Sequence, residues 1–335
     1  GLRPVLSDHP HFAVPTPDTM SHAIVTENLT KHYGDQRVVD GLTLRVPAGS
    51  VYGLLGRNGA GKSTAIKMIT GMVQPDFGTA QLLGEQVGQL KPSTRARIAY
   101  LAEGHPMYGW MSINEAVKFT RQFYENWNQR LVEQILDHFK LCGRQKYRRL
   151  SRGQQAQVSL ALSRAPEPEL LILDDPTLGL DTVVRRDFLE SLIQIIQRRG
   201  RTILFSSHIL GDVERVADRL GIMIDGVLRV DCRTDTFRDS VRKVLVEFHG
   251  RPPEALSVPG LVSSRPVGAG LELVTVGYGD MQREAIEKLE PRSIEVLDLN
   301  LEDAFIEYTR GARTALPVFS QEPTHDQSVG AQGAA

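Results

Sequence analysis

The chain has 335 residues, of which 41% are hydrophobic and 24% charged, so it can bury a packed core and does not have the composition of a disordered chain. Its 39 Lys and Arg against 40 Asp and Glu give a formal net charge of −1, so no global field draws it to nucleic acid or anionic lipid. Two cysteines, Cys142 and Cys232, are too few for a disulfide framework, which favours the cytoplasm.

The N-terminal segment Gly1–Thr19 contains four prolines and lacks the apolar stretch of a secretory signal. We expect residues 1–21 to be a flexible extension, with Met20 as a candidate native start. No run of about 18 apolar residues occurs in the sequence, so we expect no membrane-spanning helix. Any role at a membrane would then depend on another subunit.

Residues 22–235 are predicted to form an α/β domain, because short β-rich runs alternate with helical periodicity and this pattern is typical of a largely parallel sheet. The first two predicted strands flank a turn and are expected to form an antiparallel pair at an edge. The predicted strands are Ala23–Asn28, Arg37–Val46, Ser50–Leu55, Ile98–Leu101, Leu170–Leu173, Thr202–Ser206 and Gly221–Ile224.

A helical insert is expected within this domain, over about residues 104–165. Ser112 and Glu115 have the spacing of a capping box, and apolar residues recur at helical spacing after them. A second helix is predicted over Gln129–Phe139. Another begins after Ser151, which is placed as its N-cap.

Composition shifts after the dipeptide Asp225-Gly226, which predicts a hairpin turn. Residues 236–310 are predicted to form a small α+β domain, and residues 311–335, rich in Gly, Ala, Gln and Ser, a disordered tail. The expected strands are Lys243–Phe248, Leu271–Val276 and Ser293–Leu297, and the expected helices are Asp280–Leu289 and Leu301–Thr309.

The strongest motif runs from Gly56 to Thr64, reading GRNGAGKST, between an apolar strand and a helical stretch. Its glycines allow backbone N–H groups to curl around phosphate oxygens, and the helix N-terminus adds positive potential. Lys62 supplies a full charge and the hydroxyl of Ser63 can hold Mg²⁺. The alternative is a glycine-rich turn without a ligand.

Two further segments carry candidate site residues. The apolar run Leu170–Leu173 ends in Asp174 and Asp175, and a buried strand delivers such residues to the carboxyl edge of its sheet. There Asp174 can orient Mg²⁺ and Asp175 can position a water molecule. The helix that begins at Ser151, with Gly153 in its first turn, offers a second anion site, or is simply a capped helix.

In their order and spacing these motifs resemble the ATP-binding-cassette (ABC) family over about Ala23–Val230, about 60% of the chain. The resemblance implies a P-loop NTPase fold and ATP with Mg²⁺ as ligands. It assigns Gly56, Asn58, Gly59, Gly61, Lys62, Ser63 and Thr64 to the Walker A motif, Ser151, Gly153 and Gln154 to the signature loop, Asp174 to Walker B, Asp181 to the D-loop, His208 to the switch that contacts the γ-phosphate, and Tyr33 to adenine stacking.

Three residues depart from the family pattern. Glu103 occupies the position of the usual glutamine and can still reach metal or water. Arg152 replaces the first glycine of the signature. Asp175 replaces the usual catalytic glutamate and is one methylene shorter, so hydrolysis is expected to be slow or confined to the other site of a heterodimer.

The resemblance further implies a head-to-tail homodimer or heterodimer, in which the signature loop of one subunit closes over the nucleotide of the other. Our leading hypothesis is an ATPase subunit on the cytoplasmic face of the inner (plasma) membrane, which powers a separate transmembrane permease. The ending Leu299–Glu307 resembles that of export-type cassettes, and Pro106–Met111 is expected to contact the permease.

Two other hypotheses stay open at this point. A non-transport cassette acting on ribosomes or DNA has support only in the basic residues Arg144, Lys146, Arg148 and Arg149, and we expect no nucleic-acid partner. A regulatory nucleotide binder with weak hydrolysis is suggested only by Asp175.

Overall fold

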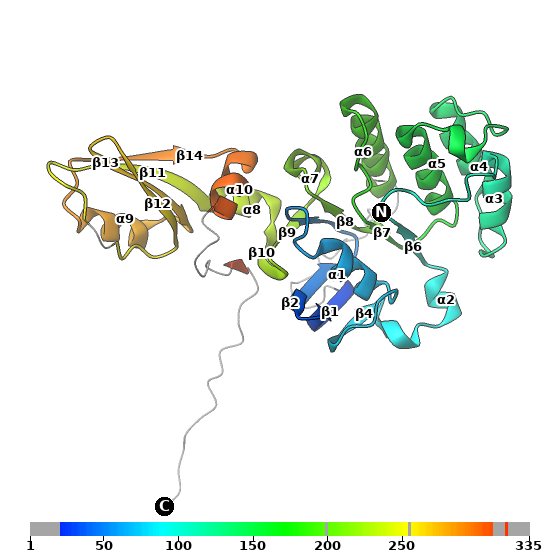
Figure 1. Cartoon of the computed structure of the whole chain (residues 1–335), viewed down its shortest axis with the longest axis horizontal. Coiled ribbons are helices and arrows are strands. Elements are labelled where there is room, and N and C mark those ends of the chain that lie inside the picture. The colour runs from blue at the N-terminus through cyan, green and yellow to red at the C-terminus, as the bar shows by residue number, and fades with distance from the viewer. Residues whose placement is uncertain (1–20, 198–199, 254–255, 311–318, 321–335) are drawn as a thin grey trace, which may run out of the picture.

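The computed structural model describes residues 21–197, 200–253, 256–310 and 319–320, arranged as three β-sheets with helices around them (Figure 1). The predicted N-terminal extension lies outside the described residues except for residue 21. Of the predicted tail, only Phe319–Ser320 are described, and they form the short strand β15, so the prediction of disorder is wrong at these two residues.

The central sheet has seven strands in the described part of the chain, and the strands β9, β3, β8, β7 and β6 pair with one another in parallel. Only β10 breaks this pattern, because the turn at Asp225-Gly226 folds it back antiparallel on β9. The order is β15-β10-β9-β3-β8-β7-β6, with β3 Val51–Leu55, β6 Ile98–Leu101, β7 Leu170–Leu173, β8 Thr202–Ser207, β9 Arg219–Ile224 and β10 Val227–Arg233. The predicted strands of the α/β domain therefore form, with shifts of up to two residues at their ends, except that the first strand runs on to Tyr33, five residues beyond its predicted end.

Both faces of the central sheet are covered, so its strands are apolar on both sides. In β3, Val51 and Leu55 face one hydrophobic core with α5 (Arg152–Arg164), α6 (Thr182–Gln197) and α7 (Leu210–Val216). Tyr52 and Leu54 face a second core with α1 (Lys62–Ile69). Figure 1 accordingly shows α5, α6 and α7 on one side of the sheet and α1 on the other.

A second, antiparallel sheet closes over α1. It has the order β2-β1-β4-β5, with β1 His22–Tyr33, β2 Gln36–Pro47, β4 Phe77–Leu82 and β5 Glu85–Gln86. The predicted antiparallel pairing of the first two strands is confirmed, but the pair belongs to this separate sheet and not to an edge of the central one. The sequence analysis missed β4, whose first residues are exposed and lack a period-two pattern.

Helices α3 (Ile113–Arg121) and α4 (Gln129–His138) pack on α5 as a helical subdomain at one end of the molecule (Figure 1). The predicted capping box is present: the hydroxyl of Ser112 accepts from the Glu115 amide at 3.2 Å, and the Glu115 carboxylate accepts from the Ser112 amide at 2.6 Å. Short helical turns connect these parts: η2 Val87–Gln89, α2 Pro92–Arg95 and η3 Tyr147–Arg149.

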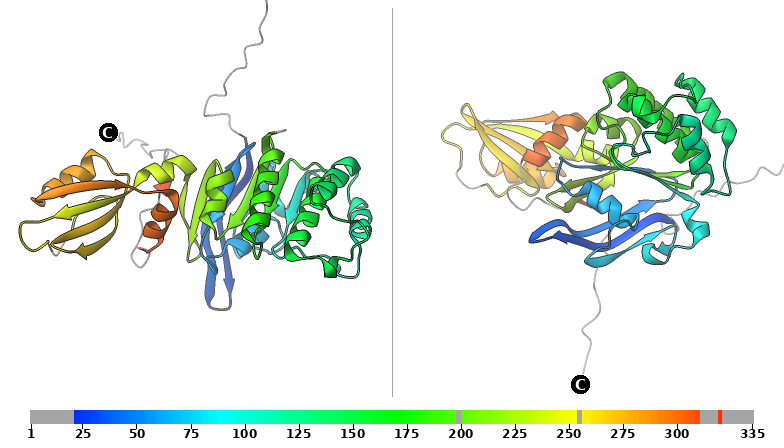
Figure 2. Two further views of the ribbon diagram at one scale, coloured as in Figure 1. Left: turned by 90° about the horizontal axis from the view of Figure 1, so that it is seen from above. Right: turned by 45° about the vertical axis from the view of Figure 1, so that its right-hand side comes forward.

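The C-terminal part forms a four-stranded antiparallel sheet, β12-β13-β11-β14, at the end opposite the helical subdomain (Figure 2). Helix α10, together with α8, joins it to the central domain, since Tyr308 of α10 packs its ring edge-on against Phe237 of α8, with ring centroids 5.8 Å apart. The elements are α8 Thr234–Ser240, β11 Val241–Glu247, β12 Leu261–Val267, β13 Gly270–Val276, α9 Asp280–Glu287, β14 Ser293–Asp298 and α10 Leu301–Arg310; of the strands, only β12 was not predicted.

Candidate nucleotide-binding site

The loop between β3 and α1 is held in a tight curl by its glycines. Gly59 and Gly61 have φ of 83° and 96°, a region that side chains rarely adopt. A Cβ placed on Gly56 would lie 2.7 Å from the carbonyl oxygen of Met223, and one on Gly61 would lie 2.5 Å from that of Val38. The neighbouring strands therefore require glycine at Gly56 and Gly61.

Lys62, the first residue of α1, is buried inside this curl. Its Nζ donates to the carbonyl oxygens of Gly56 at 2.8 Å and Arg57 at 3.2 Å. Burial lowers the pKa of Lys62, and the nearby charges of Asp175, Asp174 and Glu103 oppose that shift. An anion bound in the loop would restore the preference of Lys62 for the charged form.

Ser63 and Asp174 meet at the carboxyl edge of the central sheet. The Ser63 hydroxyl donates to Asp174 Oδ1 at 2.9 Å, and Ser206, at the end of β8, donates to the same oxygen at 2.9 Å. Asp174 Oδ2 is buried without a hydrogen-bond partner. A buried carboxylate oxygen of this kind is suited to a cation or to an ordered water.

Asp175 and His208 form a second pair at the same edge. His208 Nδ1 lies 2.7 Å from Asp175 Oδ2, while Asp175 Oδ1 is buried without a partner. The Asp175 amide donates to the Ser206 hydroxyl at 2.8 Å, and the residue has φ of 40°, a conformation that aspartate tolerates better than most residues. The backbone thus aims the carboxylate at the imidazole.

The sequence analysis did not single out Ser206, although it touches both aspartates. A signal was present, because Ser206 lies near the end of a strand that neighbours β7 in a parallel sheet. Tyr100 was also missed: its buried hydroxyl has no partner, and burial, with the charges of Asp174 and Glu103, raises its pKa to about 12. Glu103 itself is exposed in the loop after β6.

The remaining predicted residues of the phosphate loop region lie at its rim. Asn58 is exposed and Thr64 half-buried. Tyr33, at the end of β1, is 51% exposed, with Lys31 Nζ 5.8 Å from its ring centroid. A ring this exposed is free to stack on a planar ligand.

The predicted signature residues lie at the N-terminus of α5. Ser151 and Gln154 form a capping box, in which the Ser151 hydroxyl accepts from the Gln154 amide at 3.2 Å. Gly153 is buried against Val184, which a Cβ would approach to 2.8 Å. Asp181 caps the next helix, accepting from two amides at 3.0 Å.

The structure does not bring the α5 helix to the phosphate loop of the same chain. The loop precedes α1, and α1 and α5 lie on opposite faces of the central sheet (Figure 1). The two predicted anion sites therefore lie at the ends of helices on opposite faces of the sheet.

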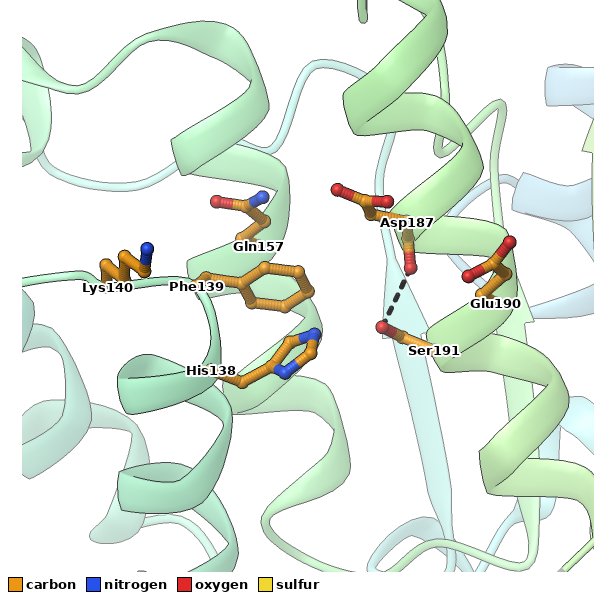
Figure 3. Close-up of a pocket in the computed structure, with 7 residues that line it drawn as sticks. All are labelled: His138, Phe139, Lys140, Gln157, Asp187, Glu190 and Ser191. Atoms are coloured by element: carbon orange, nitrogen blue, oxygen red, sulfur yellow. Dashed lines mark hydrogen bonds between the residues drawn. The ribbon is translucent and has the colours of Figure 1, made fainter.

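A polar cleft of about 370 Å³ separates the helical subdomain from α6, and none of the predicted site residues line it (Figure 3). His138, Phe139, Lys140 and Gln157 face Asp187, Glu190 and Ser191 across it. The Ser191 hydroxyl donates to the Asp187 carbonyl oxygen on its own helix at 2.9 Å. This cleft is thus distinct from the nucleotide site.

A glycine-curled loop around a buried lysine, with serine and aspartate at the carboxyl edge of a parallel sheet, defines a P-loop nucleotide-binding protein. Residues 39–178 match the family model described as ABC transporter. Together with the relatives that follow, this match shows that the chain belongs to the ABC transporter ATP-binding family.

Several curated relatives are similar to this chain in sequence. The bacitracin transport ATP-binding protein BcrA of Bacillus licheniformis is 33% identical, over 68% of this chain and 74% of that protein. The ABC transporter ATP-binding protein YtrB of Bacillus subtilis is 28% identical over 87% of this chain and 99% of its own length. The Nod factor export ATP-binding protein I of Rhizobium meliloti is 33% identical, over 86% and 88%.

A solved ATP-binding subunit of an ABC transporter superposes with a TM-score of 0.58 at 28% identity, covering 65% of this chain and 92% of the other. The predicted α/β P-loop fold is thereby confirmed. The chain is an ATP-binding and ATP-hydrolysing subunit of an ABC transporter, and the transport hypothesis prevails over the two alternatives. Among the described residues, no helix is long and apolar enough to cross a bilayer.

Proposed function

We propose that this ATPase subunit powers export through a separate transmembrane permease, to which it binds on the cytoplasmic face of the inner membrane. ATP closes a dimer of two such subunits and hydrolysis releases it. The observation that carries this proposal is the separation of the phosphate loop from the α5 N-terminus within one chain. Two chains placed head to tail would complete both sites.

Export is supported by the relatives, whose names include bacitracin transport and Nod factor export. Two of them match over about 86% of this chain, which exceeds the central domain alone. The C-terminal sheet thus falls within the shared length. We expect the partner subunit to be a second copy of this chain or a related cassette, and no nucleic acid to take part.

Mg²⁺ fits the pair Ser63 and Asp174, because Asp174 Oδ2 is buried without a partner and the Ser63 hydroxyl is adjacent. Among the described residues, no cluster of three or more His, Cys, Asp or Glu side chains forms a protein-only metal site. The ion would therefore share its coordination with nucleotide oxygens and waters, and Glu103 can reach it through water. When bound, it neutralises charge on the phosphates.

The other residues of the site have separate roles in ATP binding and hydrolysis. Lys62 and the loop amides hold the β- and γ-phosphates. Asp175 Oδ1, which has no other partner, accepts a hydrogen bond from the attacking water. His208 is oriented through Nδ1 by Asp175, which leaves Nε2 for the γ-phosphate. Tyr33 stacks on adenine, and Ser151, Gly153 and Gln154 reach the γ-phosphate of the opposite subunit, next to Asp181.

A groove of about 480 Å³ between the central domain and the helical subdomain is the proposed permease contact. It contains part of the predicted contact segment, Pro106 and Met107, together with Tyr100, Tyr124 and Leu162. Its apolar floor suits a short amphipathic segment from a membrane protein. The groove is lined by β6 and by the loop that follows it, so its occupant would sit close to Glu103.

Co-expression with a candidate permease tests this proposal. We expect the two chains to copurify, and the permease in a bilayer to raise ATP turnover severalfold. A Leu162→Asp change in the groove should weaken copurification, whereas Ile286→Asp, a matched change in the C-terminal domain, should not do so if that domain still folds. Full association of the Leu162 variant would contradict the assignment of the groove.

A further inference from the structure

The helical subdomain carries a row of aromatic rings on its outer surface. Trp110 lies 6.0 Å from Tyr108, Tyr108 lies 5.9 Å from Phe119, and Phe119 lies 5.2 Å from Phe123, measured between ring centroids. Three of the four rings are more than half exposed: Tyr108 by 55%, Trp110 by 61% and Phe123 by 67%. A contiguous aromatic surface of this kind marks an interaction site.

Arg148 contacts the segment that carries the first two rings, and two more basic residues adjoin Arg148 or the row in sequence. The Arg148 amide donates to the carbonyl oxygen of Gly109, between Tyr108 and Trp110, at 3.1 Å. Arg148 and its neighbour Arg149 are exposed, as is Lys118 beside Phe119. No ion pair within the described part of the chain engages these three cations, whereas the acidic Glu115 is already paired with Lys146 at 3.1 Å.

The helical subdomain is strongly basic although the whole chain is not. Residues 104–165 contain ten Lys and Arg and four Asp and Glu, whereas the full chain has a net charge of −1. The near-zero net charge of the full chain therefore coexists with a local excess of positive charge in the helical subdomain, and this excess would attract an anionic surface.

We infer that this aromatic and basic patch, formed by Tyr108, Trp110, Phe119, Phe123, Lys118, Arg148 and Arg149, binds the anionic headgroups of a phospholipid bilayer directly. Trp and Tyr concentrate at membrane–water interfaces, and nearby Lys and Arg bind anionic lipid. The composition of the patch matches both requirements.

The neighbouring groove supports a lipid occupant for the patch. None of the four aromatic rings lines that groove, but Met107, Thr120 and Tyr124, which do, adjoin them in the chain. A permease segment seated in the groove comes from the bilayer, so the rim around it faces the membrane. This step rests on the proposed function; the charge and aromatic content of the patch do not.

Co-sedimentation of the full chain with vesicles that lack any permease tests the inference. We expect binding to vesicles of phosphatidylglycerol and phosphatidylcholine, little binding to pure phosphatidylcholine, and a large loss in 0.5 M NaCl. Arg148→Gln with Arg149→Gln should weaken partitioning on the order of tenfold or more. Trp110 fluorescence, read in a Trp127→Phe background, should shift to the blue on binding.

Two matched variants serve as controls. Phe77→Ala removes an aromatic ring that is 67% exposed on β4, and Arg251→Gln removes an exposed cation of the C-terminal domain; neither should alter binding. Equal binding to neutral vesicles, no binding at all, or equal losses in the controls would overturn the inference. Two results for the double arginine variant would also overturn the inference. In one, the variant loses binding to the permease but still binds vesicles. In the other, it loses binding to duplex DNA but still binds vesicles. A negative result in vesicle binding would not contradict the permease proposal, because that proposal is tested separately by copurification.

Discussion

The Nζ of Lys62 donates to two backbone carbonyl oxygens, and burial lowers the pKa of this lysine, so a bound anion would stabilise its charged form. Lys62→Ala should therefore weaken ATP binding about tenfold or more, because it removes the charge that faces the phosphates. Equilibrium binding of a fluorescent ATP analogue measures the effect. Lys288→Ala, an exposed lysine at the end of α9, is the matched control, and parental affinity in Lys62→Ala would refute the site.

Asp175 is the residue whose side-chain length matters most. Asp175→Asn should hydrolyse ATP on the order of a hundredfold more slowly while still binding it, since an amide cannot accept the proton of the attacking water. Asp175→Glu should hydrolyse ATP as fast as the parent or faster, because the added methylene brings the carboxylate nearer to the water.

Steady-state turnover of these proteins at saturating ATP distinguishes the roles of Asp175, with Asp235→Asn on the exposed side of α8 as a control. Equal rates for the parent and Asp175→Asn would show that another group positions the water. A slow Asp175→Glu with unchanged binding would instead show that the 2.7 Å contact with His208 depends on the shorter side chain.

At the site, sequence spacing predicted the residues of each strand end but not the contacts between them. Lys62 and Ser63 follow from a local motif, and Asp174 from an apolar strand that ends in acids. The contact of Asp175 with His208 joins residues far apart in the chain and depends on the adjacency of β7 and β8. Ser206 could not be predicted as a site residue, because a serine in a strand matches no motif and its role depends on which side chains lie beside it.

Among the elements, buried strands were easier to predict than exposed ones. β7 and β8 are buried throughout because helices and a second sheet cover both faces, and apolar residues fill β7 and the middle of β8. β4 and β12 bury only two residues and one residue, respectively, and carry Gly78 and Pro266, so no alternation marks them. Their pairing depends on the partner strands β1 and β13, which a local pattern cannot show.

The capped N-terminus of α5 is expected to act on the nucleotide of the other subunit. Neither a Lys62→Ala nor a Ser151→Arg homodimer has an intact composite site. In a mixed dimer, one site combines the parental phosphate loop with a parental α5, so turnover should return when the two proteins are mixed.

Turnover across a range of mixing ratios, with heterodimers quantified by differently tagged subunits, measures this complementation. Ser112→Arg in place of Ser151→Arg is a suitable control, because Ser112 caps α3 rather than α5. Inactivity in every mixture that contains heterodimers would count against the head-to-tail arrangement.

Over the whole molecule, α10 joins the C-terminal sheet to the central domain through a shared hydrophobic core and through one buried carboxylate. Glu307 accepts hydrogen bonds from Arg265 Nη2 at 2.8 and 2.9 Å and from Lys243 Nζ at 3.2 Å, and Arg265 also pairs with Glu272. On the same helix, Leu301, Ala304 and Tyr308 are buried in a hydrophobic core to which both the central domain and the C-terminal sheet contribute. Loss of this carboxylate should therefore loosen the attachment of the sheet.

Glu307→Gln should lower the midpoint of thermal unfolding at pH 7 by a few degrees, because Arg265 and Lys243 would lose the anion that they share. Arg265 is partly exposed, so the free energy of unfolding should fall by only about 1–2 kcal/mol. Burial alone would raise the pKa of Glu307, but the hydrogen bonds from Arg265 and Lys243 outweigh it and lower that pKa. A lowered pKa in the folded state means that the stabilisation is complete above the ordinary value of about 4.3 and is lost as the pH falls further.

The difference between parent and Glu307→Gln should therefore be constant from pH 7 to about pH 5 and shrink below about 4.3. Calorimetric scans at several pH values measure it, with Glu287→Gln as the control. Glu287 pairs with Arg283 one turn away at 2.9 Å, but both side chains are exposed, so its replacement should change the midpoint little at any pH. A difference for Glu307→Gln that grew on acidification would mean that the buried carboxyl group is protonated in the folded protein, and that α10 is held by its apolar face alone.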